Sequence, residues 1–389
     1  MELEYGQLAA WLSCACFIAA AVGCFYALAV AWLACRLRGE PTESTCACPP
    51  VTILKPLRGG EPELYANLLS FCVQDYPAPV QIVFGVHDAS DPAVAVVHRL
   101  MDQFPELDLE LVVDPRRYGA NSKISNLINM SDRTRHDILV VSDSDIRVEA
   151  DYLRRVVPPL TQSGVGVVTC LYRGASTSGP WAQLSAQAID HHFLPSVLLA
   201  VELDLAHPCL GSTIALRTDT LSRMGGFEAF GEQLADDYAL GEAVRRFGLE
   251  IVIAPCVVTH YCTEATIGDL MRHEWRWART IRLLAPIGFL GSSLTHALPF
   301  ALLGAAIDGF APAGLVMIAS ALASRLILQI HMDEALGVEE DRAWWGPVRD
   351  LLSFVIFVTS FFGNDVTWRG QRFSVRADGT LVYIADSAR

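Results

Sequence analysis

Two short acidic motifs combine residue types and positions suited to ligand binding: a carboxylate at Asp88 could accept hydrogen bonds from a uracil or a ribose, and a D-x-D pair could hold a cation. Asp88 follows the β-rich segment 80–86, and Asp143 and Asp145 form a D-x-D arrangement after the apolar segment 137–142. Two carboxylates at D-x-D spacing can hold one divalent cation, which would neutralise phosphate groups. A turn or a solvated loop is the alternative for both motifs, because Asp and Ser are common turn residues.

A third acidic motif is the pair Asp236 and Asp237 in the segment LADDYALGEAVRRFG, which is predicted to contain the start of a helix. Carboxylates favour helix N-termini through the helix dipole, so helix capping is one interpretation. The other is a general base that takes a proton from a hydroxyl group. Two adjacent carboxylates could also raise each other's pKa.

The motif His273-Glu274-Trp275-Arg276-Trp277 offers a cation beside an aromatic surface. Arg276 could pair with phosphate oxygens, and Trp277 offers a flat face to a sugar or a base. The alternative is an interfacial belt, because Trp and Arg gather where a chain enters a membrane and an apolar segment starts at residue 283.

The elements around these motifs predict an α/β fold. Helices are expected over 63–72, 92–104 and 123–130, between strands over 51–54, 80–86, 109–113, 137–142 and 165–171. Strands that alternate with helices at this spacing form a mostly parallel sheet. Ligands of such sheets bind at the carboxyl ends of the strands, where the first two acidic motifs fall.

Uncharged apolar segments flank this α/β region. Residues 8–35 are long enough to span a bilayer, with acidic residues before them and Arg36 and Arg38 after them. The positive-inside rule places the N-terminus outside and Arg36 in the cytoplasm. The segments 283–307 and 309–324 are two further candidate crossings.

The expected domain organisation follows from these segments. Residues 8–35 are a transmembrane anchor, 50–282 a cytoplasmic domain, and 283–330 two transmembrane helices. Residues 351–364 are short for a crossing and suit an interfacial or re-entrant segment. The tail 365–389, which contains Arg369, Arg372 and Arg376, is expected in the cytoplasm.

Composition excludes several classes of protein. The chain is 52% hydrophobic and only 19% charged, whereas soluble domains average about 25% charged residues. A net charge of −14 argues against nucleic acid as a partner, because binding it requires a basic surface. The 11 Cys show neither a disulfide framework nor zinc spacing, although Cys46 and Cys48 form a C-x-C pair. No G-x-G-x-x-G after a strand, P-loop or G-x-S-x-G motif is present.

The motifs VHDASDP, ANSKISNL, SDSDI, GSTIALRTDTLSRMGGF, LADDY and HEWRW follow one another in this order. Together they resemble the GT-A glycosyltransferases of the family 2/21 group, and among these the ceramide glucosyltransferase-like enzymes. Within that group, QIVFGVHDASDP, GVVTCLYRG, FLPSVLLA and HEWRWARTIR are most similar to the bacterial glycosyltransferases of hopanoid biosynthesis. The resemblance runs from about residue 50 to 305 and implies a GT-A fold, a Rossmann-like, mostly parallel sheet.

The resemblance also implies roles for single residues. Asp88 matches the Asp that contacts the nucleoside of the donor, and Lys123 matches the Lys near the donor. Asp143 matches the second family Asp, in contact with the donor and the metal, and Asp145 matches the usual metal ligand, for Mg²⁺ or Mn²⁺. Asp237 matches the catalytic base.

Arg276 and Trp277 match the Arg-Trp pair of the family motif (Gln/Arg)-x-x-Arg-Trp, which contributes to donor binding. The first position of that motif is His273 in this chain, which departs from the family pattern.

The activity implied by the resemblance is an inverting transfer at the cytoplasmic face of a bacterial inner membrane. The expected donor is UDP-N-acetylglucosamine, and the expected acceptor is a hydroxyl of a membrane lipid, a hopanoid such as bacteriohopanetetrol. One alternative is a ceramide glucosyltransferase that uses UDP-glucose. An alternative of another class is a non-catalytic, lipid-binding membrane scaffold. The apolar segment 180–203 is either a soluble core helix or a surface element that borders the path of the lipid.

Overall fold

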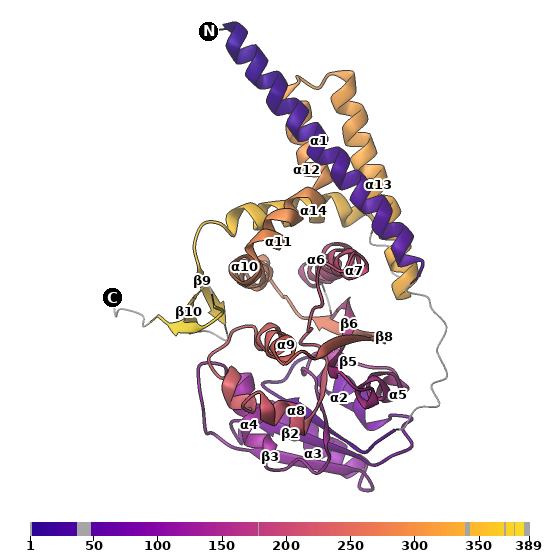
Figure 1. Cartoon of the computed structure of the whole chain (residues 1–389), viewed down its shortest axis with the longest axis vertical. Coiled ribbons are helices and arrows are strands. Elements are labelled where there is room, and N and C mark those ends of the chain that lie inside the picture. Colours follow the sequence, from indigo (N-terminus) through magenta and orange to yellow (C-terminus); the bar gives the residue numbers. More distant parts are fainter. Residues whose placement is uncertain are drawn as a thin grey trace. The chain divides into compact units, whose positions relative to one another are not determined.

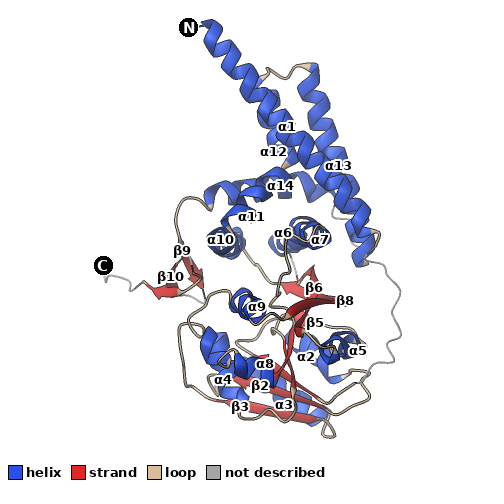
Figure 2. Cartoon of the chain, viewed as in Figure 1, coloured by secondary structure: helices blue, strands red, loops and turns tan. Residues whose placement is uncertain are grey.

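The computed structural model describes residues 2–36, 48–177, 179–338, 343–368, 371–376 and 378–384. Arg38, Cys46 and Arg369 lie outside the described residues. The chain divides into two compact units. The sheet unit comprises Glu40–Ala186, Asp204–Ala265 and Thr367–Arg389, and the helical unit comprises Met1–Gly39, Gln187–Leu203 and Thr266–Val366. All strands of the large sheet belong to the sheet unit, as Figures 1 and 2 show.

The large sheet has eight strands in the order β3-β2-β1-β4-β7-β6-β8-β5. The strands are β1 (Val51–Pro56), β2 (Val80–Val86), β3 (Asp108–Val113), β4 (Ile138–Val141), β5 (Ile146–Arg147), β6 (Val165–Ser176), β7 (Ile214–Arg217) and β8 (Glu250–Cys262). Strands β3, β2, β1 and β4 are parallel neighbours, and β6 is parallel to β8. Strand β7 is antiparallel to β4 and β6, and β5 is antiparallel to β8. The predicted α/β class with a mostly parallel sheet is confirmed.

Strand β4 is apolar throughout and β1 is mostly apolar, because both faces of these strands are covered. Val51 and Ile53 pack into one hydrophobic core, and Leu54 packs into a second core. The first core is closed by α2 (Leu64–Cys72), α3 (Pro92–Gln103) and α5 (Tyr152–Val156), and the second by α4 (Ser122–Ser131), α8 (Thr218–Arg223) and α9 (Asp236–Arg246). Strands buried on both faces read as continuous hydrophobic runs rather than as alternating patterns.

A small antiparallel sheet lies near the end of the chain. It consists of β9 (Asp365–Trp368), β10 (Gln371–Val375) and β11 (Leu381–Tyr383). Within the sheet unit, the Leu234 amide donates to the Gly379 carbonyl at 3.1 Å. Part of the predicted tail is therefore folded against the loop that precedes α9.

The helical unit contains two helices that are long and apolar enough to cross a membrane, α1 (Glu2–Ala34) and α13 (Pro312–Leu336). The helix pair 286–295 and 297–307 would form a third span but is bent by 64°. The second part of this pair, α12 (Ala297–Ile307), packs beside α1 and α13. The packing is close because small residues face it: a Cβ on Gly304 would lie 2.7 Å from the Phe17 ring.

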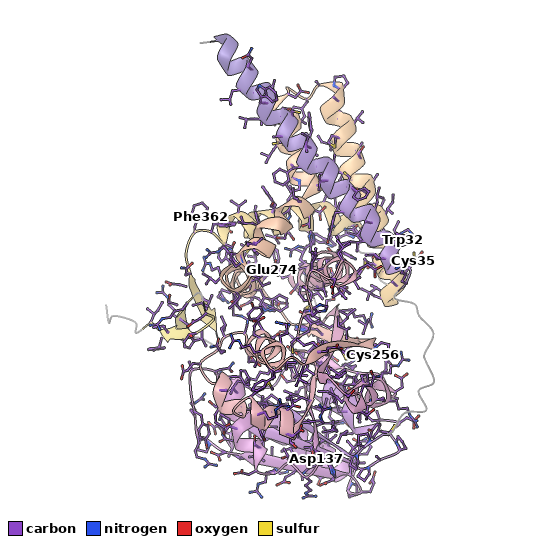
Figure 3. The ribbon with its side chains drawn as sticks, viewed as in Figure 1. Trp32, Cys35, Asp137, Cys256, Glu274 and Phe362 are labelled. Carbon is purple, nitrogen blue, oxygen red and sulfur yellow. The ribbon has the colours of Figure 1, made fainter. Side chains whose placement is uncertain are left out.

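The remaining helices of this unit are α7 (Leu194–Glu202), α10 (Ile267–Leu284), α11 (Pro286–Gly291) and α14 (Gly346–Thr359). Glu274 of α10, labelled in Figure 3, forms a two-pronged ion pair with Arg349 of α14, at 2.6 and 2.7 Å. Arg349 is only 1% exposed, so the pair is a charge-assisted link between the two helices. Phe362, just beyond α14, is 75% exposed.

The apolar segment 180–203 is divided between the two units. Its first residues, in α6 (Gly179–Ala188), belong to the sheet unit, whereas Gln187–Leu203 belongs to the helical unit. Between α6 and α7 the chain forms a π-helical turn, Ile189–Phe193. In this turn His191 Nε2 lies 2.7 Å from Asp333 Oδ1 of α13. The second half of the segment therefore contacts α13, a helix that is long and apolar enough to cross a membrane, and its position beside a lipid path stays a prediction.

Candidate functional site

The D-x-D loop lies between β4 and β5, and a buried lysine donates hydrogen bonds to it. Lys55 of β1 is fully buried, and its Nζ donates to the Asp143 carbonyl at 2.5 Å and to Ser142 Oγ at 3.3 Å. Burial lowers the pKa of Lys55 to about 7, against the opposing effect of Asp143 and Asp145. The backbone of the loop is thus fixed by a side chain from the adjacent parallel strand.

A second lysine joins two of the acidic motifs. Lys123 Nζ lies 2.8 Å from Asp143 Oδ1 and 3.2 Å from Asp236 Oδ2. Asn121 caps α4 by accepting from the Lys123 amide, and its Nδ2 also contacts Asp236 Oδ1 at 3.3 Å. Burial opposes the charged form of Lys123, but Asp143, Asp236 and Asp237 outweigh it and hold the pKa well above its usual value.

Asp237 is held at the start of α9 with both carboxylate oxygens fixed. Oδ2 accepts from the Gly211 amide at 3.0 Å, and Oδ1 accepts from the Tyr238 amide at 2.8 Å. Burial and the neighbouring Asp236 raise the pKa of Asp237 to about 6. At pH 7 such a carboxylate is mostly ionised yet more basic than an ordinary Asp, which suits proton acceptance.

Asp145 lies beside two side chains, His260 and Glu61, that each have one buried atom without a hydrogen-bond partner among the described residues. Strand pairing of β5 with β8 sets Ile146 opposite His260, and His260 Nε2 lies 3.8 Å from Asp145 Oδ2. Glu61 Oε1 accepts from Ser144 Oγ at 3.1 Å. Burial and Asp145 raise the pKa of Glu61 to about 7. Neither His260 Nε2 nor Glu61 Oε2 makes a hydrogen bond with any described residue.

These groups fit a metal ion that is shared with a phosphorylated ligand. Among the described residues, no three His, Cys, Asp or Glu side chains are grouped closely enough to hold a metal by themselves. The Asp145 carboxylate and His260 Nε2, which has no hydrogen-bond partner among the described residues, are groups of the type that bind a divalent metal, and Asp143 is engaged by Lys123. Mg²⁺ is often bound by one or two protein carboxylates, with substrate phosphates and water as its other ligands. The protein groups in this region would likewise fill only part of the coordination shell of a metal ion.

Asp88 lies at the same edge of the sheet, after β2, with β1 between β2 and β4. It is exposed, and its Oδ1 accepts from the amide and the hydroxyl of Ser90, both at 2.8 Å. These hydrogen bonds lower the pKa of Asp88 and form a local turn. Contact between Asp88 and a nucleoside stays a prediction.

Arg276 and Trp277 belong to α10 of the helical unit. The Trp277 ring packs against His273 at a centroid distance of 4.7 Å and against Phe193 at 6.3 Å. His273, the departure from the family motif, thus packs edge-on against the Trp277 ring. The donor-binding role of Arg276 and Trp277 stays a prediction.

Four groups in this region were not predicted from the sequence: Lys55, Glu61, Tyr172 and His260. Burial, together with Asp237 and Asp145, raises the pKa of Tyr172 well above its usual value, so Tyr172 of β6 is close to both carboxylates. The charge of Lys55 inside the apolar strand VTILKP was a usable signal. His260 was not, because β8 was not recognised as a strand.

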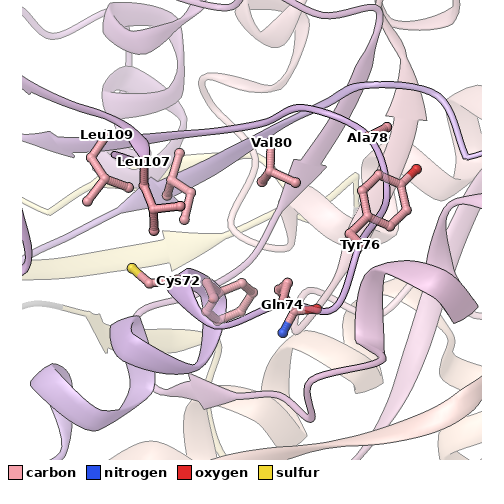
Figure 4. A pocket seen from close by; sticks show the side chains of 9 residues that line it. Cys72, Gln74, Tyr76, Ala78, Val80, Leu107 and Leu109 are labelled. Carbon is pink, nitrogen blue, oxygen red and sulfur yellow. The ribbon is translucent and has the colours of Figure 1, made fainter. Parts of the chain in front are cut away.

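A cavity of about 160 Å³ in the sheet unit lies away from these residues. It is lined by residues that include Cys72, Gln74, Val80 and Leu109 (Figure 4). Val80 is the first residue of β2, so the cavity is at the amino ends of the strands. Ligands of parallel sheets bind at the opposite ends, where Asp143, Asp145 and Asp237 are found, and this cavity is not part of the candidate site.

Comparison with known proteins shows the family to which the chain belongs. Ceramide glucosyltransferase 1 of Caenorhabditis elegans is 23% identical over 86% of this chain and 73% of its own length. Ceramide glucosyltransferase 3 of the same organism is 23% identical over 93% and 81%. A solved mannosyltransferase of Pyrobaculum calidifontis, in complex with GDP-Man and Mn²⁺, is 20% identical with a TM-score of 0.49, over 90% of this chain and 99% of that one. The model of glycosyl transferase family 21 matches residues 15–381, and the chain is therefore a glycosyltransferase of that family.

Proposed function

We propose that this glycosyltransferase moves N-acetylglucosamine from UDP-N-acetylglucosamine to a hydroxyl of a membrane lipid, a hopanoid such as bacteriohopanetetrol, with inversion. The observation that supports a transfer to a hydroxyl is the state of Asp237, a half-buried carboxylate whose pKa is raised to about 6 by loss of solvation and by Asp236. It adjoins Asp236, which the Lys123 bridge connects to the D-x-D loop. A proton acceptor is thereby placed next to a cation suited to an anionic donor.

The proposed reaction is a single displacement at the anomeric carbon. The lipid oxygen forms a bond to that carbon while the bond from the carbon to the diphosphate oxygen breaks. The hydroxyl proton passes to a carboxylate oxygen of Asp237, whose orientation the Gly211 and Tyr238 amides fix. Lys123 neutralises part of the charge that develops on the departing diphosphate. The direction of attack inverts the sugar configuration.

Mg²⁺ or Mn²⁺ is the proposed cofactor, held by Asp145 and His260, with Asp143 beside it. Such an ion would neutralise the diphosphate and stabilise it as a leaving group. Asp88 is proposed to contact the nucleoside, and Arg276 and Trp277 the rest of the donor. These assignments extend the resemblance to residues whose roles the geometry leaves open.

A second candidate is transfer of glucose from UDP-glucose to ceramide. It is favoured by the two Caenorhabditis elegans relatives, which are ceramide glucosyltransferases. Both candidates need a lipid acceptor, and the two apolar helices α1 and α13 are compatible with membrane association. We place the enzyme in the bacterial cytoplasmic membrane with the sheet unit facing the cytoplasm, on the positive-inside argument.

The decisive experiment tests each of two sugar donors with each of two lipid acceptors. The full chain in lipid nanodiscs is incubated with Mn²⁺, either UDP-N-acetylglucosamine or UDP-glucose, and either bacteriohopanetetrol or ceramide. Extracted lipids are then weighed by mass spectrometry. We expect the mass of an N-acetylglucosaminyl hopanoid. A hexosyl ceramide as the main product would replace our proposal with the second candidate, and hydrolysis of donor without any lipid product would reject both acceptors.

Lys123 allows a test of the base through pH. Lys123 lowers the pKa of Asp237, so Lys123→Met should raise it further. In the wild type, turnover should fall as the pH drops below about 6, because Asp237 then binds a proton. This fall is the acid limb of the pH profile, and in Lys123→Met it should move to higher pH. Lys123→Arg keeps the charge and is the matched control. An acid limb at the same pH in all three proteins would mean that Asp237 is not the titrating base.

A further inference from the structure

A cavity of about 180 Å³ lies within the helical unit, between α13 and α14. Its apolar wall includes Leu322, Leu326 and Pro347, and its polar side is formed by Arg325, Gln329 and Asp350. Among the described residues, α13 is one of two helices that are long and apolar enough to cross a membrane, so a membrane lipid is the ligand class to consider for this cavity.

The charges at the cavity are already matched. Arg325 and Asp350 are 4% and 3% exposed, and Arg325 Nε and Nη2 contact the Asp350 carboxylate at 2.7–3.1 Å. Arg325 Nη2 also contacts the His191 carbonyl at 3.1 Å. An anionic headgroup would find no uncompensated cation here, and it would have to break a buried ion pair to gain one.

Gln329 is the polar residue of the cavity whose side chain is available for a hydrogen bond to a ligand. It is 3% exposed, it lines the cavity, and its side-chain amide makes no hydrogen bond with any described residue. The amide faces the cavity, where a ligand can complete its hydrogen bonding. A Cβ on Gly346 would lie 2.2 Å from Gln329 Nε2, so the start of α14 approaches this amide as closely as only glycine permits.

The rim of the cavity carries Trp344, which is 66% exposed. Its ring packs on that of Trp345 at a centroid distance of 4.1 Å. Paired tryptophans are typical of the level where a membrane meets water, which is also the level of lipid hydroxyl and amide groups. The mouth of the cavity therefore fits the polar–apolar junction of a lipid.

We propose that this cavity binds one uncharged membrane lipid that carries a hydroxyl or amide group. The apolar body of the lipid packs against Leu322, Leu326 and Pro347. Its hydroxyl or amide completes the hydrogen bonding of the Gln329 side chain. The Arg325–Asp350 pair, being neutral as a pair, excludes lipids with a phosphate charge. The sheet unit and its chemistry play no part in this inference, which goes beyond the proposed function.

The test uses photoactivatable ceramide and photoactivatable phosphatidylglycerol as probes, with the full chain in phosphatidylcholine nanodiscs. Labelled peptides are identified by mass spectrometry. We expect ceramide to label α13 and α14 and phosphatidylglycerol to label them weakly. Leu326→Trp fills the cavity and should reduce the ceramide label about tenfold. Gln329→Leu removes the amide and should reduce it about fivefold. Ile330→Trp, which adds the same ring outside the cavity lining, should leave it unchanged.

Hydrolysis of the sugar donor shows that each variant is folded, and Gln329→Leu serves as the test should Leu326→Trp fail that check. Competition with unlabelled lipid shows whether the bound lipid is the proposed acceptor or a resident lipid of the bilayer. Displacement by bacteriohopanetetrol points to the proposed acceptor, and displacement by diacylglycerol points to a resident bilayer lipid. Equal ceramide labelling in the wild type, Leu326→Trp and Gln329→Leu would overturn the proposal. So would phosphatidylglycerol labelling as strong as that by ceramide, or no displacement by either competitor. None of these results depends on lipid glycosylation, so the proposed function would stand.

Discussion

Asp237→Asn should lower turnover by about 10²- to 10⁴-fold, which is the usual contribution of a general base. Asn keeps the size of the side chain and can still accept from the Gly211 or Tyr238 amide, but it cannot take a proton from the acceptor. Donor binding should be largely kept, because it is Asp236, rather than Asp237, that contacts Lys123. Turnover is measured with radiolabelled donor, and binding of UDP is measured by calorimetry.

The matched control is Asp236→Asn, which alters the adjacent carboxylate. Asp236 Oδ2 lies 3.2 Å from Lys123 Nζ, so its loss should weaken donor affinity more than it lowers turnover. The raised pKa of Asp237 owes part of its shift to Asp236, and the acid limb of this variant should move to lower pH. A greater loss of turnover in Asp236→Asn than in Asp237→Asn would show that the base is the other carboxylate.

Asp145→Ala should lose nearly all metal-dependent turnover, at least about 100-fold, because removing even supporting groups of a metal site costs 10- to 100-fold. His260→Ala should raise the Mn²⁺ concentration needed for half-maximal activity by about 10- to 100-fold, since its Nε2 is the unpartnered neighbour of Asp145. Turnover is followed against Mn²⁺ concentration, and calorimetry reports Mn²⁺ binding in the presence of UDP.

An exposed acid on α3, Asp102, offers the control for lost negative charge, and Asp102→Ala should behave as the wild type. His260→Ala and Asp145→Ala should also weaken Mn²⁺ binding when no sugar is transferred, which separates a ligand from a group needed only for folding. Turnover by the wild type that survives a chelator would refute the metal assignment altogether.

The sequence by itself determined the class of fold and the position of the acidic loop. Apolar runs such as ILVV, in a chain where strands alternate with helices, are typical of strands covered on both faces, and the residues that follow such a strand, Asp143 and Asp145, lie at its carboxyl end. The two apolar helices α1 and α13 follow from length and composition alone, because a bilayer-spanning helix needs about 20 apolar residues. These conclusions depend on local patterns.

Only the tertiary structure decided which of these groups meet and in what state. Lys123 joins Asp143 to Asp236, and β5–β8 pairing brings His260 beside Asp145, across separations of roughly 20 to 115 residues that leave no periodic trace in the sequence. Asp88 proved to be engaged in a turn with Ser90. The pKa of Asp237 is raised because burial removes water from its charged form, and burial is a property of the folded chain.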